Sequence, residues 1–272
     1  MRRIIDSEKC VEIPESGDGY ESLEDSRVSF INKSRIRRLV GKKKLGLAWL
    51  VLDPVVTSLI YLFVFIVIRA NPNPETIFIG ITLYRVMQST FLGGTEFLND
   101  FSGGLKAERV SSKSISKAII RFRILDSFLQ SLGVGIVLLF FFNSEVIAVI
   151  YFLFIAQVMG FLFEGFGICF FLVVKRIQDL SNIFKYAFSL LFFASPCLYP
   201  MSQAEGLHYV ANEYNPFSYF AESMRFAFGL DSVFEDLDMR IFIFFISALL
   251  FFSVRGYRRI DEFRWEVSSW GS

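Results

Sequence analysis

The sequence predicts an all-α integral membrane protein that crosses the bilayer six times and keeps both termini in the cytoplasm. Three observations predict this class. The composition is 53% hydrophobic with 34 phenylalanines, six long apolar runs follow a polar start, and basic residues concentrate in alternate connections. Soluble domains carry a smaller apolar share and more charge. The formal net charge is only +1, so the overall charge balance indicates no nucleic-acid partner.

Two polar segments precede the first apolar run. Residues 1–29 predict a mobile acidic leader, because acidic residues alternate there with serine and glycine without a periodic apolar face. Residues 30–47 predict a basic amphipathic helix on the membrane surface, since lysines and arginines accompany apolar residues at helical spacing. No cleavable signal peptide is visible, so membrane insertion is expected to begin with an internal span.

Six apolar runs are each close to the roughly 20 residues that cross a hydrocarbon core. The predicted spans are residues 48–68, 77–98, 124–142, 146–174, 184–200 and 240–254. An aromatic-rich stretch at 208–228 predicts one or two short re-entrant or interfacial helices between spans five and six. The transmembrane domain is therefore expected to cover residues 48–260, followed by a cytoplasmic tail at 261–272.

The distribution of positive charge predicts the orientation, because cytoplasmic loops are enriched in lysine and arginine. Of the 28 lysines and arginines, 24 lie before span one, between spans two and three, between spans four and five, or after span six. The connection between spans five and six is acidic instead. We therefore expect both termini in the cytoplasm, and a multi-pass protein of the cytoplasmic (inner or plasma) membrane.

The entry to span one carries polar and ring residues that a plain span does not need. Trp49 is placed as an interfacial indole, and Asp53 and Pro54 follow it. A carboxylate at this depth is costly unless it is paired or hydrated, and Pro54 kinks the helix unless its neighbours compensate. The pattern fits either a kinked helix end with a solvated Asp53 or a functional role.

The loop at 99–123 is long, basic and, by the predicted orientation, cytoplasmic. One reading is a loop that only sets topology. The other is a short surface helix that docks on a cytoplasmic partner, with a serine at 111–116 capping a helix that continues into span three.

The outer segment at 196–228 begins where prolines end span five. Irregular backbone at membrane depth is tolerated only where it packs in protein or lines a water-filled cavity. Asn215 is positioned to cap a helix that starts at Pro216. Glu222 and Arg225 are three residues apart and can pair on one helical face. The alternative is a structural turn with a solvated ion pair.

Three short motifs along these spans together resemble the type 2 ABC exporter permeases. They are Leu-Gly-x-x-Trp-x-x-Leu-Asp-Pro at 45–54, Arg-x-x-Asp-Leu at 176–180, and Asn-Pro-x5-Glu-x2-Arg at 215–225. The resemblance covers roughly residues 35–265 and is closest to the polysaccharide-export branch of capsule and O-antigen systems, with the related teichoic-acid permease. It implies half of a transporter: a homodimer of permeases, each with a separate ABC ATPase, moving a lipid-linked glycan through the membrane.

Three sets of residues receive predicted roles, the first from the resemblance and the other two from their residue types and places in the spans. The set that couples to the ATPase is Leu105, Lys106, Glu108, Arg109 and Lys113. The set expected along the channel is Tyr61, Phe65, Tyr84, Arg85, Phe188, Phe192 and Tyr199. The set expected at an outer gate is Pro196, Pro200, Asn215, Pro216, Glu222 and Arg225.

The channel set combines rings with one cation. Aromatic faces stack on the apolar faces of pyranose rings, and Arg85 can bind the phosphate of a lipid carrier. The alternative for each ring is lipid contact or core packing. Arg85 departs from the apolar or aromatic residue that the family usually has in span two. It must face a cavity, a partner or a phosphate, or else snorkel to the outer interface.

The chain has no Gly-x4-Gly-Lys-Ser/Thr phosphate-binding loop, so ATP and Mg²⁺ are expected on the partner ATPase and no cofactor on this chain. We expect no catalytic residues and no metal site, since His208 is the only histidine and the three cysteines are scattered. Two alternatives stay open. One is a drug, antibiotic or lipid cargo, and the other is a membrane-embedded transferase. For a transferase, the acids Asp53, Asp126 and Glu164 lack a shared motif.

Overall fold

The computed structural model describes most of the transmembrane region and parts of the N-terminal segment. The described residues are 3–6, 9–12, 26, 28–30, 32–33, 36–37, 46, 48–68, 73–97, 112–177, 179–260 and 262. Within them, the only strands are β1 (Arg3–Asp6) and β2 (Lys9–Glu12), which form an antiparallel hairpin inside the predicted leader. Strands of four residues leave little periodic signal, so the sequence did not indicate this hairpin.

The described residues between 26 and 37 are helical, in part within the predicted interface helix. Val28 is fully buried and packs in a small apolar cluster with residues of the bundle such as Phe97, Ile119 and Phe171. Most of the remaining predicted interface helix lies outside the described residues.

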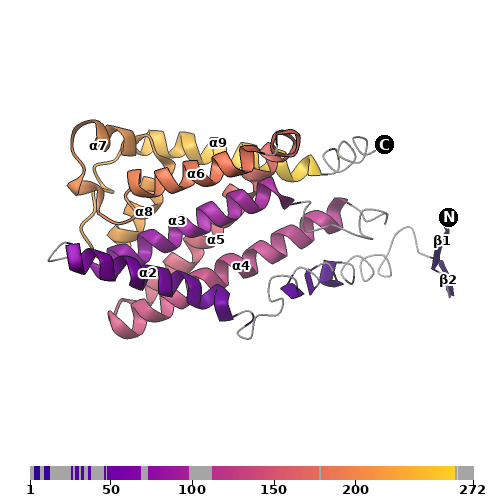
Figure 1. Ribbon diagram of the computed structural model, residues 1–272, viewed down its shortest axis with the longest axis horizontal. Helices are drawn as coiled ribbons and strands as arrows, with labels where there is room; N and C mark the ends of the chain where they lie inside the picture. Colours follow the sequence, from indigo (N-terminus) through magenta and orange to yellow (C-terminus); the bar gives the residue numbers. More distant parts are fainter. Residues whose placement is uncertain are drawn as a thin grey trace.

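Six long helices form the bundle in the described part of the chain (Figure 1). They are α2 (Ala48–Ile68), α3 (Pro74–Thr95), α4 (Ser112–Phe141), α5 (Val146–Arg176), α6 (Asp179–Ala194) and α9 (Met239–Arg258). Between α6 and α9 come a 3₁₀ turn, η3 (Met201–Gln203), and two short helices, α7 (Gly206–Glu213) and α8 (Pro216–Ala227). Two short helices are thus present where the sequence predicted one or two, and their re-entrant or interfacial placement stays a prediction.

The centre of the bundle is the crossing of α3 and α5, and α4 and α9 pack on α5 from other sides. Glycines let the two central backbones touch. A Cβ atom at Gly94 would lie 2.3 Å from the carbonyl oxygen of Glu164, and one at Gly167 would lie 2.2 Å from that of Phe91. No side chain fits at these distances, so glycine is required for the close approach.

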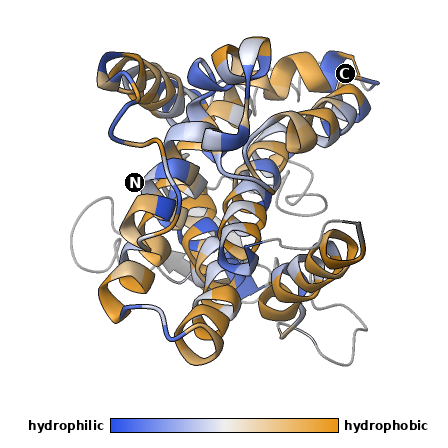
Figure 2. Ribbon diagram, turned by 90° about the vertical axis from the view of Figure 1, so that its left-hand side faces the viewer, coloured by the Kyte–Doolittle hydropathy of each residue, from blue (hydrophilic) through white to orange (hydrophobic). Residues whose placement is uncertain are grey.

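The outer faces of the bundle are apolar. Viewed from the α7–α8 end, hydrophobic residues colour the surrounding helices, while hydrophilic residues gather in the connections and toward the middle (Figure 2). Among the described residues, four helices are long and apolar enough to cross a membrane: Ala48–Val67, Ile115–Phe141, Val146–Arg176 and Met239–Arg258. These findings indicate a membrane protein. The helices at the other two predicted spans, α3 and α6, are not among these four, and α6 has only 16 residues.

Several predicted boundaries were wrong. Helix α4 begins at Ser112, so the second half of the predicted 99–123 loop is the basic first part of a long helix, as the serine signal had indicated. Helix α6 covers Asp179–Ala194 instead of 184–200, because the prolines after Ala194 end it. Helix α2 continues through Pro54.

Candidate functional site

A cavity of about 260 Å³ lies between α2, α3 and α6. Its lining residues are Thr57 and Tyr61 from α2, Ile81, Tyr84, Arg85 and Gln88 from α3, and Phe188, Ser189, Phe192 and Phe193 from α6. Five of the seven residues predicted along a channel therefore meet in one place. We call this cavity the α2–α3–α6 groove.

Aromatic rings form the apolar wall of the groove. The ring of Tyr84 meets Phe192 edge-on at 5.2 Å and Phe188 at 6.2 Å, and Tyr61 lies 5.1 Å from Phe192, all between ring centroids. The Tyr84 hydroxyl donates to the backbone carbonyl of Phe188. These contacts hold α6 against α3 and fix the ring positions.

Arg85 supplies the charge in the groove, and it is paired with Asp53. Its Nη2 lies 2.9 Å from Oδ2 of Asp53, while Nη1 donates to the Asp53 carbonyl oxygen at 3.2 Å and to Oγ1 of Thr57 at 2.5 Å. The side chains are 32% and 57% exposed. Arg85 stands in the middle of α3 and turns toward the first half of α2, the half that begins beside Trp49. This direction is opposite to the one that snorkelling toward the α7–α8 end of the bundle would require.

Two predicted channel residues lie outside the groove. Phe65 is half-buried and packs against the main apolar core. The Tyr199 hydroxyl donates to the carbonyl oxygen of Ala194 at 2.9 Å and contacts Nε2 of His208 at 2.8 Å. Tyr199 thus belongs with the outer segment.

The predicted pair in the outer segment is present and completely buried. Nη1 of Arg225 lies 2.5 Å from Oε1 of Glu222, and both side chains have no exposed surface. Arg225 also donates from Nη2 to the carbonyl oxygen of Pro196 at 2.5 Å. The two carboxylate oxygens of Glu222 accept the backbone N–H groups of Met201 and Val233, each at 3.0 Å. The alternative of a solvated pair is wrong, because three segments wrap around it.

Hydrogen bonds fasten the two short helices to the end of α6. Oδ1 of Asn215 accepts the N–H of Phe217, which confirms the predicted cap of the helix that starts at Pro216, and its Nδ2 donates to Ser195. The carbonyl oxygen of Ala194 contacts Nε2 of His208 at 2.9 Å and accepts from Nδ2 of Asn212 at 3.1 Å. Pro196 and Pro200 are buried in the same segment. The six predicted gate residues therefore lie in one packed unit.

Sequence reasoning missed a charged cluster at the core. Arg123 of α4 lies 2.7 Å from Asp126 and 3.0 Å from Glu164 of α5, and the Tyr257 hydroxyl of α9 is 3.2 Å from Glu164. Asp126 and Glu164 are therefore not scattered acids. Two signals could have found the cluster: the i, i+3 spacing on α4, and an isolated carboxylate inside an apolar span, which needs a cation.

The arrangement of apolar helices around a charged groove fits a membrane transport component, and a family comparison decides the class. Residues 28–229 match the family model described as ABC-2 type transporter. The chain belongs to the ABC-2 type transporter family. Such a permease is the transmembrane component of an ABC exporter and is not itself catalytic, so an ABC ATPase is implied as its partner. A comparison with curated proteins finds no match.

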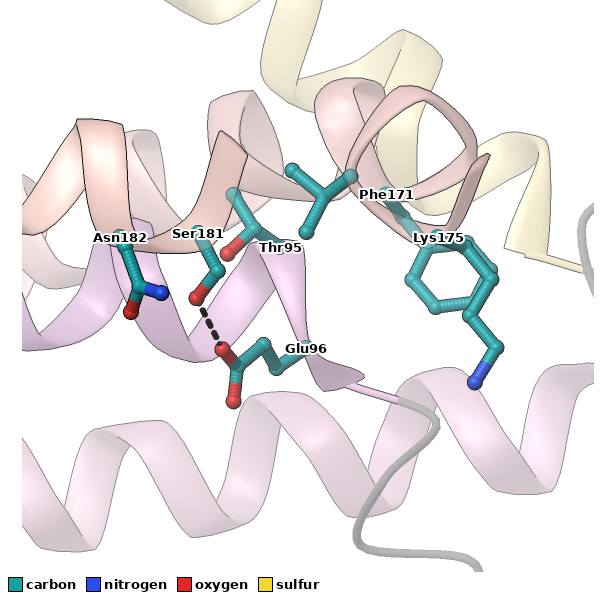
Figure 3. A pocket seen from close by; sticks show the side chains of 7 residues that line it. Thr95, Glu96, Phe171, Lys175, Ser181 and Asn182 are labelled. Carbon is teal, nitrogen blue, oxygen red and sulfur yellow. Dashed lines mark hydrogen bonds between the residues drawn. The ribbon is translucent and has the colours of Figure 1, made fainter. Parts of the chain in front are cut away.

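A second hollow of about 320 Å³ lies at the other end of the bundle, between α3, α5 and α6. Figure 3 shows Ser181 at the start of α6 pointing toward Glu96 at the end of α3, and the Ser181 hydroxyl donates to Oε1 of Glu96 at 2.6 Å. The other lining residues are Thr95, Phe171, Val174, Lys175 and Asn182. This bond ties the start of α6 to the end of α3, the helix that precedes the predicted coupling loop in the sequence.

The coupling residues themselves are not tested. Leu105, Lys106, Glu108 and Arg109 lie outside the described residues. Lys113 falls in the first turn of α4, and its side chain also lies outside the described part.

Proposed function

We propose that this chain is the permease subunit of an ATP-driven exporter that moves a lipid-linked polysaccharide, of the O-antigen, capsule or teichoic-acid type, across the cytoplasmic membrane. Family membership supports the permease role. The observation that carries the cargo class is the groove, in which aromatic rings of three helices surround one guanidinium. Rings offer flat apolar surface to sugars, and a guanidinium binds phosphate through paired hydrogen bonds.

Six spans with both ends in the cytoplasm are part of this proposal. Figure 1 shows the starts of α2 and α4 and the ends of α3 and α9 at one end of the bundle, while α7 and α8 lie at the other. The loops at the first end hold most of the lysines and arginines. Helix α6 is only about 24 Å long at 1.5 Å per residue. The buried Ser195–Leu198 stretch that follows would complete its crossing.

A second copy of the permease would close the groove. On α6, Asn182, Lys185 and Ser189 are exposed, and beside them Arg85 is one-third exposed. Polar groups of this kind are costly against lipid tails, so we place them toward a water-filled path between two permeases. A homodimer built around this face would put the path on its two-fold axis.

ATP hydrolysis by the partner would drive the movement. The loop between α3 and α4 is the proposed docking point, and closure of the ATPases would rock the two permeases about their interface. Charge reversal of Glu108 and Arg109 is then expected to abolish co-purification with the ATPase. Unchanged assembly would reject this docking point.

Deletion of the gene tests the function directly. We expect lipid-linked glycan to accumulate on the cytoplasmic side and surface glycan to disappear, with both restored by the wild-type gene. Normal surface glycan in the deletion strain would reject the polysaccharide cargo. Loss of drug or lipid export in that strain would assign the alternative cargo class.

A further inference from the structure

We propose that Asp53 is a built-in competitor for cargo: Arg85 binds an anionic group of the cargo, a phosphate or a carboxylate, only when that group displaces Asp53. The inference rests on the proposed function and names the chemical feature that the cargo must carry. It makes Asp53 a residue that sets specificity and leaves cargo binding to Arg85.

The contacts of Arg85 come from one helix and can be released together. All three polar contacts of its guanidinium are to Asp53 and Thr57, which lie one turn apart on α2. No other described residue is hydrogen-bonded or ion-paired to this guanidinium. A modest shift of α2, or an anion arriving from the groove, would therefore free its donors in a single step.

Partial exposure makes the exchange feasible. Asp53 and Arg85 are 57% and 32% exposed, and ion pairs reached by water contribute little to stability. The pairs at Arg123 and Arg225 differ, because their side chains are almost or completely buried and could not exchange partners without opening the core. Arg85, by contrast, lines a cavity that could hold cargo.

The rest of the groove fits an anion joined to an apolar or sugar body. Of the described residues that line it, Arg85 alone is charged. Gln88 and Ser189 add neutral polar groups, and four of the rings supply flat apolar surface: Tyr61, Tyr84, Phe188 and Phe192. Asp53 lies beside this cavity and occupies the guanidinium as a cargo anion would. A neutral cargo would gain nothing from displacing it, so the pair discriminates against neutral molecules.

Binding to the purified full-length permease tests the inference. The protein would be placed in phosphatidylcholine nanodiscs with Trp265→Phe and Trp270→Phe, so that the remaining indole, Trp49, lies one helical turn from Asp53 and reports on it. The probes are farnesyl phosphate and its neutral counterpart farnesol, with partition into empty nanodiscs subtracted.

Two variants test the roles of Asp53 and Arg85 separately. Asp53→Asn removes the competitor, so farnesyl phosphate should bind about three- to fivefold more tightly, the range expected for loss of one exposed ion pair. Arg85→Gln should remove the preference for the phosphate over farnesol. Unchanged or weaker binding to Asp53→Asn overturns the inference, and so does an unchanged preference in a folded Arg85→Gln protein.

A matched control separates a local effect from a change in overall charge. Arg259 pairs with Glu262 at 2.6 Å, and this pair is exposed to a similar degree outside the groove. Glu262→Gln removes one carboxylate, as Asp53→Asn does, and should leave the affinity for farnesyl phosphate unchanged. An equal gain in both variants would mean that net charge alone attracts the probe, and would overturn the proposal.

Two further arms identify the source of the anion. Competition by an oligogalacturonate, but not by a neutral maltooligosaccharide, would assign the anion to acidic sugars. Binding of farnesyl phosphate alone would assign it to the phosphate of a lipid carrier. Failure of the binding assays would leave the deletion phenotype, and hence the exporter role, intact. A normal deletion phenotype would reject the exporter role without changing the Asp53→Asn result.

Discussion

The groove at Arg85 and the core at Arg123 both pair an arginine with carboxylates inside a helical bundle, yet their surroundings differ. At Arg123 the side chain is 6% exposed and Glu164 is completely buried, and the cluster joins α4 to α5 and, through Tyr257, to α9. At Arg85 both partners are partly exposed and the contacts reach only one neighbouring helix. A similar pairing therefore serves structure in one place and is available for binding in the other.

The cost of an unpaired charge explains this difference. Taking an ion out of water is expensive, so a buried pair that loses one partner leaves the other charge without compensation. The Asp53–Arg85 pair is partly exposed, and in the proposed water-filled path water would compensate either partner when the other leaves. The comparison predicts a graded set of responses to substitution.

The largest effect is expected at the core. Arg123→Ala would leave Asp126 and Glu164 buried without their cation, and should lower the free energy of unfolding by about 3–5 kcal/mol. Denaturant unfolding of the purified protein in detergent would measure the loss. Arg85→Ala is the control, with an expected loss of about 0–1 kcal/mol for an exposed pair. Equal losses in the two variants would remove the distinction between the sites.

A similar loss is expected in the outer segment. Glu222→Ala removes the partner of Arg225 and the acceptor for the N–H groups of Met201 and Val233, at a cost of about 3–5 kcal/mol. Limited proteolysis should then cut within residues 199–238. The exposed Glu205 offers a control, since Glu205→Ala should leave the proteolytic pattern unchanged.

A smaller effect is expected where the central helices touch. Gly94→Ala would push α3 away from the Glu164 backbone and should cost about 1–3 kcal/mol, the usual range for overpacking. Gly135→Ala is the matched control, because its Cβ would meet a Val149 side-chain carbon at 3.3 Å, and a side chain can shift. Thermal unfolding that ranks Gly135→Ala as the more harmful change would contradict the close approach.

The smallest effect on stability should come with a large effect on export. Arg85→Gln is expected to change the free energy of unfolding by less than about 1 kcal/mol. Surface glycan in a complemented deletion strain should nevertheless fall about tenfold, because the groove loses its cation. Arg85→Lys should restore part of the export, since it keeps the charge without the paired donors. Full export by Arg85→Gln would exclude a role for this cation.

Features that depend on neighbouring residues could be predicted from the sequence. Contacts between segments far apart in the chain could not. Helices α2, α5 and α9 end within a few residues of prediction because their apolar runs coincide with the helices. The apolar run placed span three at 124–142 because hydropathy falls at Lys117 and Arg121, whereas the serines at 111–116 indicated the helix start that the structure has at Ser112. The predicted range of α6 was shifted toward the C-terminus because the stretch at 195–200 is largely apolar, yet its two prolines end the helix before it.

The contacts of the candidate functional residues show the same difference between local and long-range prediction. The Asn215 cap and the pairing of Glu222 with Arg225 depend on residues two or three positions apart, and both were predicted. The burial of that pair depends on distant backbone at Pro196 and Val233, which spacing cannot reveal. The Asp53–Arg85 contact joins residues 32 positions apart on different helices, so it became visible only in the folded chain.

The carbonyl oxygen of Ala194 joins α6, which lines the groove, to the outer segment. One face of α6 carries Phe188 and Phe192 into the groove, and the last residue of the same helix holds Tyr199, His208 and Asn212 of the outer segment. If cargo binds in the groove as proposed, α6 cannot tilt without moving the outer segment, because that segment is hydrogen-bonded to its last residue. In the proposed exporter, cargo loading and opening of the outer segment would therefore act on the same helix, and no separate signal would be needed.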